Sequence, residues 1–173
     1  MAKRGMIVVV AAALMVGTAG CTGQPGEAQR PSACEASLQA GEAKVFTDRW
    51  DPAAELPDVG EYAEIHWQVR AAGDPCDRAV GPTDWRYQGV LKLRPEDAKV
   101  LAGMYDWGAA DPSPDPQDLD DPTQMWDALK PFVPAGVHWH NSHFYDEEEP
   151  QARWRSFYFD PDLAVAWFAM YDH

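Results

Sequence analysis

Residues 62–70 read YAEIHWQVR, and this stretch decides the class of fold. Apolar and polar side chains alternate along it: Ile65, Trp67 and Val69 form one set, and Glu64, His66, Gln68 and Arg70 form the other. Because successive residues of a strand point to opposite faces of a sheet, the alternation predicts a half-buried β-strand.

A second strand is predicted downstream, over Tyr87–Leu93, where Gly89, Leu91 and Leu93 share a face. The turn-rich segment Gly81–Asp84 (GPTD) precedes it, so a loop is expected between the two strands.

An amphipathic helix is predicted from Pro95 to about Tyr105. Pro95 occupies the first helical position, and Glu96 and Asp97 lie near the positive end of the helix dipole. The apolar residues follow at helical spacing: Ala98, Leu101, Met104 and Tyr105.

Asp111–Pro122 (DPSPDPQDLDDP) is expected to be an exposed loop, because it is rich in proline and aspartate and has no apolar period. A calcium loop is the alternative reading, but Pro116 and Pro122 stand where an EF-hand needs Gly and Glu. A short helix is expected next, opened by Asp121 and stopped at Pro131. Its buried residues would be Met125, Trp126 and Leu129.

The last third of the chain is predicted to be sheet. Val137–Tyr145 and Arg153–Phe159 are rich in aromatic residues and are separated by an acidic stretch, so they are expected to form a hairpin. Asp160–Asp162 fits a type I turn that leads to a final strand over Leu163–Tyr171. The alternative is a C-terminal helix with Asp160 as its N-cap.

These elements predict an α+β domain with a mainly antiparallel sheet of about five strands and one or two helices on one face. An all-β barrel or sandwich with a helical insertion is the alternative. A chain of 173 residues suits one ordinary domain.

Residues 1–20 have the layout of a secretory signal. Lys3 and Arg4 form a basic start, Met6–Val16 carries no charge, and small residues lead into Cys21. The apolar run is shorter than the roughly 20 residues of a membrane-crossing helix, so cleavage is favoured over a permanent anchor.

Thr18-Ala19-Gly20-Cys21 resembles the lipobox of bacterial lipoproteins. The resemblance implies that Cys21 is lipidated, becomes the new N-terminus and holds the chain at the extracytoplasmic face of the cell membrane. Thr18 stands where such signals usually carry an aliphatic residue, so cleavage without lipidation is the alternative. The expected organisation is a signal peptide over 1–20, a flexible tether over 21–33 and one extracytoplasmic domain over 34–173.

Two cysteines remain in the mature chain, Cys34 and Cys76. An even number in an exported protein predicts a disulfide, with two buried thiols as the alternative.

The mature chain is strongly acidic. The sequence has 14 basic and 28 acidic residues, and loss of Lys3 and Arg4 with the signal leaves a net charge of −16. Nucleic acid is excluded as a partner, because binding to phosphate backbones needs a basic surface. The membrane is expected to be contacted through the lipid, and the ligand to be a protein, a peptide or an envelope component.

His138-Trp139-His140 is a candidate metal site. Residues two apart on a strand share a face, so His138 and His140 can present two imidazoles to one Zn or Cu ion. His66 would be the third ligand if the two strands were neighbours. The alternative is a solvated polar face with no cofactor.

Three of the eight tryptophans are candidate ligand contacts at the surface: Trp50, Trp85 and Trp107. Each stands beside an aspartate, whereas Trp67, Trp126 and Trp139 are expected in the core.

The sequence has no Gly-x-Ser-x-Gly elbow, no phosphate-binding glycine loop and no HExxH helix, so an enzyme is the less favoured class. The function predicted is therefore a lipid-anchored binding or interaction module. The alternative is a metal-binding protein or metal-dependent hydrolase that uses His138 and His140.

Overall fold

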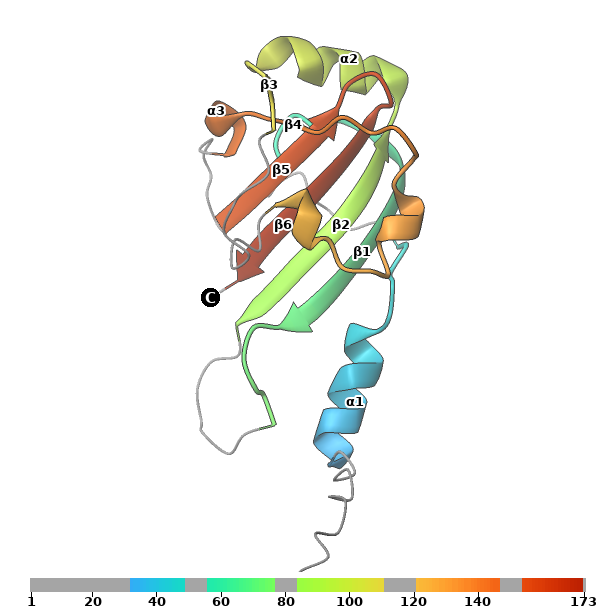
Figure 1. Ribbon diagram of the computed structural model, residues 1–173, viewed down its shortest axis with the longest axis vertical. Coiled ribbons are helices and arrows are strands. Elements are labelled where there is room, and N and C mark those ends of the chain that lie inside the picture. The colour runs from blue at the N-terminus through green and yellow to red at the C-terminus, as the bar shows by residue number, and fades with distance from the viewer. Residues whose placement is uncertain (1–31, 49–55, 77–83, 111–120, 147–153, 173) are drawn as a thin grey trace, which may run out of the picture. The chain divides into compact units, whose positions relative to one another are not determined.

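The computed structural model describes residues 32–48, 56–76, 84–110, 121–146 and 154–172, all within one unit that runs from residue 31 to residue 173. An antiparallel sheet of six strands, in the order β1-β2-β6-β5-β4-β3, organises this unit (Figure 1). The strands are β1 (Tyr62–Ala71), β2 (Trp85–Leu93), β3 (Gly108–Ala109), β4 (His140–Asn141), β5 (Trp154–Asp160) and β6 (Val165–Asp172). The predicted α+β class is confirmed, and because the sheet is open the barrel alternative is wrong.

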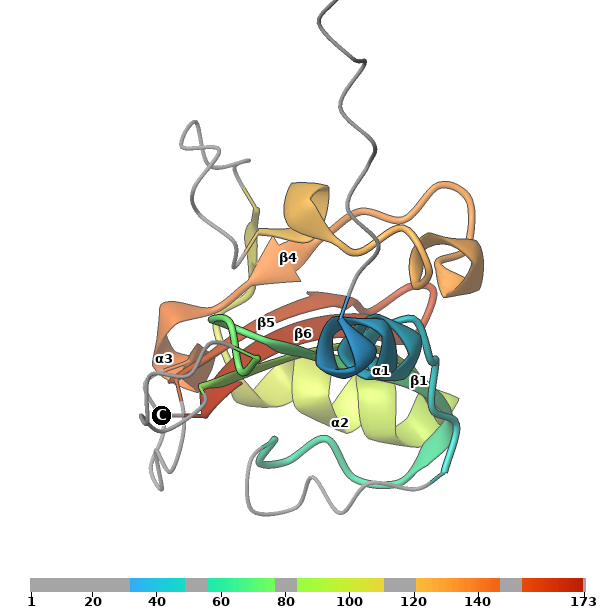
Figure 2. The same ribbon diagram turned by 90° about the horizontal axis from the view of Figure 1, so that it is seen from below.

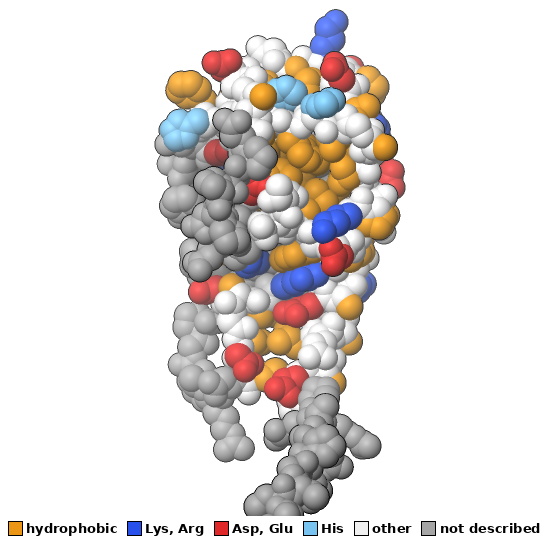
Figure 3. Space-filling view, viewed as in Figure 1, with side chains coloured by type: hydrophobic (Ala, Val, Ile, Leu, Met, Phe, Trp, Pro, Cys, Tyr) orange, Lys and Arg blue, Asp and Glu red, His pale blue; other side chains and the backbone are white. Residues whose placement is uncertain are grey.

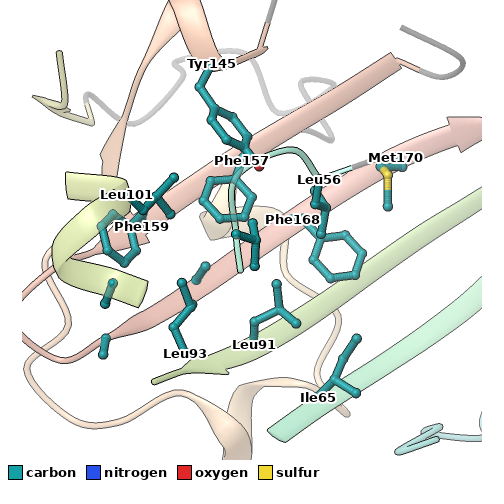
Figure 4. Packing of buried hydrophobic residues seen from close by; sticks show 14 residues of the cluster. Leu56, Ile65, Leu91, Leu93, Leu101, Tyr145, Phe157, Phe159, Phe168 and Met170 are labelled. Atoms are coloured by element: carbon teal, nitrogen blue, oxygen red, sulfur yellow. The ribbon is translucent and has the colours of Figure 1, made fainter. Parts of the chain in front are cut away.

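One face of the sheet is covered by helices, as expected. Leu101 of α2 (Pro95–Met104) and Tyr145 of α3 (His143–Asp146) pack with Phe157 and Phe159 of β5 in the larger core cluster (Figure 4). All four of these side chains are fully buried. This cluster fixes α2 across the sheet, where its predicted start at Pro95 is confirmed.

Gly89 shows how tightly the strands on this face are packed. It lies between Trp67 of β1 and Phe168 of β6 in the sheet register. A Cβ atom at this position would lie 2.4 Å from Cζ of Phe168, so the ring of Phe168 fills the space that a side chain would need. Only glycine fits here without moving a buried ring.

The opposite face is covered by residues 121–139, and Figure 2 shows this segment and α2 on opposite sides of the sheet. The helix predicted to open at Asp121 is wrong: the chain forms only 3-10 turns, at Pro122–Gln124 and Lys130–Phe132. Buried Gln88 explains the difference. Its side chain accepts a hydrogen bond from the backbone N–H of Trp126 (2.9 Å), so this N–H is bonded to the sheet instead of to a helical carbonyl.

The strand predicted over Val137–Tyr145 is mostly wrong, because only His140–Asn141 pairs with β5 and α3 follows it directly. The backbone N–H of His138 donates to Asp160 Oδ2 (2.7 Å), and the N–H of Tyr145 donates to the carbonyl of Ser142. Both groups are therefore unavailable to a β-ladder. The antiparallel pairing of this segment with β5 is nevertheless as expected.

A turn after Asp160 and a strand following it are confirmed, although the strand runs over Val165–Asp172 instead of Leu163–Tyr171, and the alternative of a C-terminal helix is wrong. Asp160 Oδ1 accepts hydrogen bonds from the backbone N–H groups of Asp162 and Leu163. Since Asp160 Oδ2 also binds His138, one carboxylate closes the β5–β6 turn and ties the 121–139 segment to it.

Residues 111–120 of the loop predicted over Asp111–Pro122 lie outside the described residues. None of the helices in the described part of the chain is both long and apolar enough to cross a membrane.

Candidate functional site

Helix α1 (Ala33–Glu42) lies beside β1 without burying a residue completely. Ser32 and Glu35 form a capping box at its start, in which each side chain accepts a hydrogen bond from the backbone N–H of the other residue. The helix has one large aliphatic side chain, Leu38, which is half-buried. Its position must therefore be set by other attachments.

Two attachments hold α1. At its N-terminal end Cys34 is bonded to Cys76, which confirms the predicted disulfide. At its C-terminal end Glu42 Oε1 accepts from the N–H of Ala71 (2.9 Å), and the Glu42 carbonyl accepts from Gln68 Nε2 (3.0 Å). The helix is thus fastened at both ends and leaves a space between them.

That space is a cavity of about 470 Å³, here called the disulfide cavity. Its apolar walls come from α1, the segment after it, the strand ends and the disulfide: Leu38, Phe46, Val69, Pro75 and Trp85, with Cys34 and Cys76. Ser37 and Glu42 add polar groups. The volume falls in the range of small-molecule sites, which are mostly apolar with a few polar groups. Figure 3 shows hydrophobic side chains beside α1 at the lower end of this face.

Phe46 is a rigid wall of the disulfide cavity. Its backbone exchanges two hydrogen bonds with Trp67 of β1, and its ring stacks on Trp67 with centroids 4.4 Å apart. The Lys44 ammonium lies 4.1 Å from the centroid of the Phe46 ring, so both the backbone and the ring are held.

Arg70 interacts electrostatically with Glu42. Burial lowers the pKa of Arg70, and the negative charges of Glu42 and Asp127 oppose that shift. Its guanidinium lies 4.2 Å from the centroid of the Trp126 ring. The half-buried guanidinium of Arg70 therefore interacts with Glu42, although Arg70 is not itself among the residues that line the disulfide cavity.

The three candidate tryptophans separate in the structure. Trp85 lines the disulfide cavity. Trp107 packs against the main core beside Tyr145 and Phe159, and its Nε1 donates to the Leu101 carbonyl (3.0 Å). Trp50 lies outside the described residues. Of the two that the structure describes, Trp85 is thus the one placed at a cavity.

The three candidate metal ligands are not brought together. His66 lies on β1 and His140 on β4, with β2, β6 and β5 between them, so the strands are roughly 19 Å apart at the usual strand spacing. His140 Nδ1 lies 2.9 Å from the carbonyl oxygen of His138. Within the five described ranges, no group of three or more His, Cys, Asp or Glu side chains is placed to hold a metal ion.

His66 instead borders a second cavity, of about 290 Å³, on the opposite side of the sheet from α2. Its Nε2 lies 2.6 Å from Glu64 Oε1, and its ring stacks on Phe132 with centroids 3.5 Å apart. This space is called the His66 cavity below.

The polar groups that line the disulfide cavity are few. Ser37 is the single hydroxyl and Glu42 the single carboxylate among the described residues that line it, and both cysteines are bonded to each other. Leu38 and Phe46 were not predicted as site residues. The one feature of the sequence that indicates that this region lies near Cys76 is the pair of cysteines, Cys34 and Cys76.

No protein-family model matches the chain, and neither a curated protein nor a solved structure was found to be similar to it.

Proposed function

We propose that this chain is a lipid-anchored extracytoplasmic binding module, and that the disulfide cavity holds an apolar group of its ligand. One observation carries the proposal: Leu38 of α1, together with Phe46, Val69 and Trp85, lines an open, mostly apolar cavity of about 470 Å³. A protein, a peptide or an envelope component can supply such a group.

The proposed location, at the extracytoplasmic face of the cell membrane, rests on the N-terminal sequence. A basic start, an uncharged run and small residues before Cys21 are typical of a bacterial lipoprotein signal. A disulfide between Cys34 and Cys76 fits this address, because disulfides persist in oxidising compartments outside the cytoplasm.

The size of the disulfide cavity sets the expected affinity. A ligand group that buries about 200 Å² of apolar surface gains about 5 kcal/mol at 25 cal/mol per Å². Association costs consume part of this gain, so an apolar group alone should bind in the micromolar to millimolar range. Tighter binding would need polar contacts as well, for which Ser37 and Glu42 are available.

Gly41 provides a matched pair of variants for the test. It lines the disulfide cavity, and a Cβ atom at this position would meet no atom within 4 Å. Gly41→Leu should place a side chain in the cavity, while Gly41→Ala makes the same helix substitution without filling it. Residues 31–173 form one unit that holds both core clusters and the disulfide, so this unit is the protein to use.

The probe is an uncharged dye such as N-phenyl-1-naphthylamine, whose fluorescence rises in apolar surroundings. We expect it to bind the unchanged unit and Gly41→Ala alike, and Gly41→Leu at least tenfold more weakly. Equal binding by all three proteins, or none by the unchanged unit, would remove the disulfide cavity from the proposal.

Lipidation of Cys21 is tested separately by growing cells with a clickable fatty acid. We expect label on the full chain and none on Cys21→Ala. An unlabelled chain that keeps residues 1–20 would contradict the anchor, whatever the dye experiment shows.

A further inference from the structure

The His66 cavity lies between the sheet and the segment that contains the 3-10 turn Lys130–Phe132. Strand β1 contributes Glu64 and His66, β2 contributes Val90 and Lys92, and β6 contributes Val165. Residues 131–134, Pro-Phe-Val-Pro, close the other side. Polar groups of both charges therefore border a small space with apolar walls.

Glu64 and Lys92 are direct cross-strand partners in the β1–β2 register. Opposite charges at such positions ordinarily pair, because their Cβ atoms lie about 5 Å apart. Here they do not: Glu64 Oε1 lies 2.6 Å from His66 Nε2, and Lys92 Nζ donates to the Leu163 carbonyl (2.6 Å). Within the described residues, the carboxylate and the ammonium thus border one cavity without forming an ion pair.

His66 holds Glu64 in this position. Its ring stacks on Phe132 with an interplanar angle of 8°, and its side chain is 13% exposed. Its other nitrogen, Nδ1, is buried and has no hydrogen-bond partner among the described residues. A buried polar atom without a partner is costly, and the stack on Phe132 is what keeps the ring in this place.

The remaining walls limit the ligand. Val90 and Val165 are almost fully buried, and Pro131, Val133 and Pro134 are apolar. A volume of about 290 Å³ lies at the lower end of ligand sites, so the ligand must be smaller than a typical drug.

We propose that the His66 cavity binds a small zwitterion with a short aliphatic side chain, an α-amino acid such as leucine. Its ammonium group pairs with Glu64, its carboxylate pairs with Lys92, and its side chain lies against the apolar residues of the 131–134 segment. Glu64 and Lys92, which do not form an ion pair with each other, then each pair with a charged group of the same ligand. This site is separate from the disulfide cavity and does not depend on it.

Other ligand classes fit less well. A metal ion lacks a set of three ligands in the described part of the chain. A simple anion would be attracted by Lys92 but repelled by Glu64, and a simple amine would meet the reverse. A ligand that carries both charges uses both groups.

The test is calorimetric titration of the full lipidated chain in detergent micelles with L-leucine and two analogues. The first analogue, 4-methylpentanoate, lacks the ammonium group, and the second, 3-methylbutylamine, lacks the carboxylate. We expect leucine to bind and each analogue to bind at least tenfold more weakly. This comparison needs no variant, so a folding defect cannot obscure it.

Variants test which protein side chain contacts each charged group of leucine. Glu64→Gln and Lys92→Met should each weaken leucine binding at least tenfold. Glu61→Gln is the matched control, because Glu61 pairs with Arg94 (2.6 Å) and is not among the residues that line the cavity. All three substituted side chains are at the surface, and circular dichroism checks that each variant is folded.

Three results would overturn the proposal: no heat of binding with millimolar leucine, an analogue that binds as tightly as leucine, or equal weakening by Glu61→Gln. The dye experiment on the disulfide cavity can succeed or fail independently of each of these.

Discussion

Replacement of Asp160 by asparagine should destabilise the domain more than its position in a turn suggests. The carboxylate is 2% exposed and accepts three backbone hydrogen bonds, from His138 (2.7 Å), Leu163 (2.9 Å) and Asp162 (3.0 Å). Oδ1 serves the turn and Oδ2 serves His138. An amide has only one acceptor oxygen, so neither of its two orientations can keep all three bonds.

The magnitude follows from the lost bond. A charge-assisted hydrogen bond contributes about 1.5–3 kcal/mol, and the buried amide N–H₂ would face a backbone N–H in either orientation, that of His138 or those of the turn. We therefore expect Asp160→Asn to lower the free energy of unfolding by about 2–4 kcal/mol at pH 7. For a domain of this size the melting temperature should fall by about 5–15 °C.

The loss should also depend on pH. Burial raises the pKa of Asp160, but the hydrogen bonds from the N–H groups of His138, Leu163 and Asp162 outweigh it and hold the pKa below its ordinary value. A depressed pKa means that the carboxylate stabilises the fold fully above the unfolded pKa of about 3.9 and loses this effect as pH falls through the folded pKa. The difference between the two proteins should be constant from about pH 5 to 7 and narrow below about pH 4.

Urea unfolding of the oxidised unit 31–173, followed by tryptophan fluorescence, measures this difference across the pH range. Asp162→Asn is the control, because this substitution removes the same charge from an exposed side chain that accepts none of these hydrogen bonds. It should change stability by no more than about 0.5 kcal/mol. Equal losses in Asp160→Asn and Asp162→Asn, or a loss that is as large at pH 3 as at pH 7, would refute the reasoning.

Three further substitutions test the packing around the sheet and α1. Gly89→Ala should cost about 1–3 kcal/mol in urea unfolding, because its Cβ would lie 2.4 Å from the Phe168 ring; an unchanged midpoint would show that the ring moves freely. The double change of Cys34 and Cys76 to serine should cost about 4 kcal/mol on the chain-entropy model for a separation of 42 residues, and should also abolish dye binding; dye affinity that survives would mean that the disulfide does not hold the cavity. Gly41→Ala should raise the melting temperature in a calorimetric scan, since alanine favours the helix by about 0.5–1 kcal/mol and meets no neighbour; a lower melting temperature would contradict the open space found there.

Much of the framework could be predicted from the sequence, because the relevant signals are local. The alternation at residues 62–70 predicts β1, and a proline followed by acidic residues predicts the start of α2. The turn that precedes β6 is predicted from Asp160–Asp162. Each of these depends on the covalent neighbours of a residue, through side-chain direction, dihedral preference or the helix dipole.

The irregular segments could not be predicted in the same way. Residues 121–139 have apolar side chains at suggestive spacing, yet their backbone groups bind Gln88 and Asp160, which lie far away along the chain. Such distant polar partners compete with local helix or strand bonds and leave no periodic signal in the sequence.

The sequence by itself therefore determined the four long strands β1, β2, β5 and β6, the helix α2, the turn and the pair of cysteines available for a disulfide, since short-range chemistry dictates them. Only the tertiary structure decided which side chains meet. The strand order places His66 four strands away from His140. The register of β1 and β2 places Glu64 opposite Lys92. Attachment of α1 at both of its ends opened a cavity between residues as distant as Cys34 and Trp85, because long-range contacts depend on how the elements pack and not on the spacing along the chain.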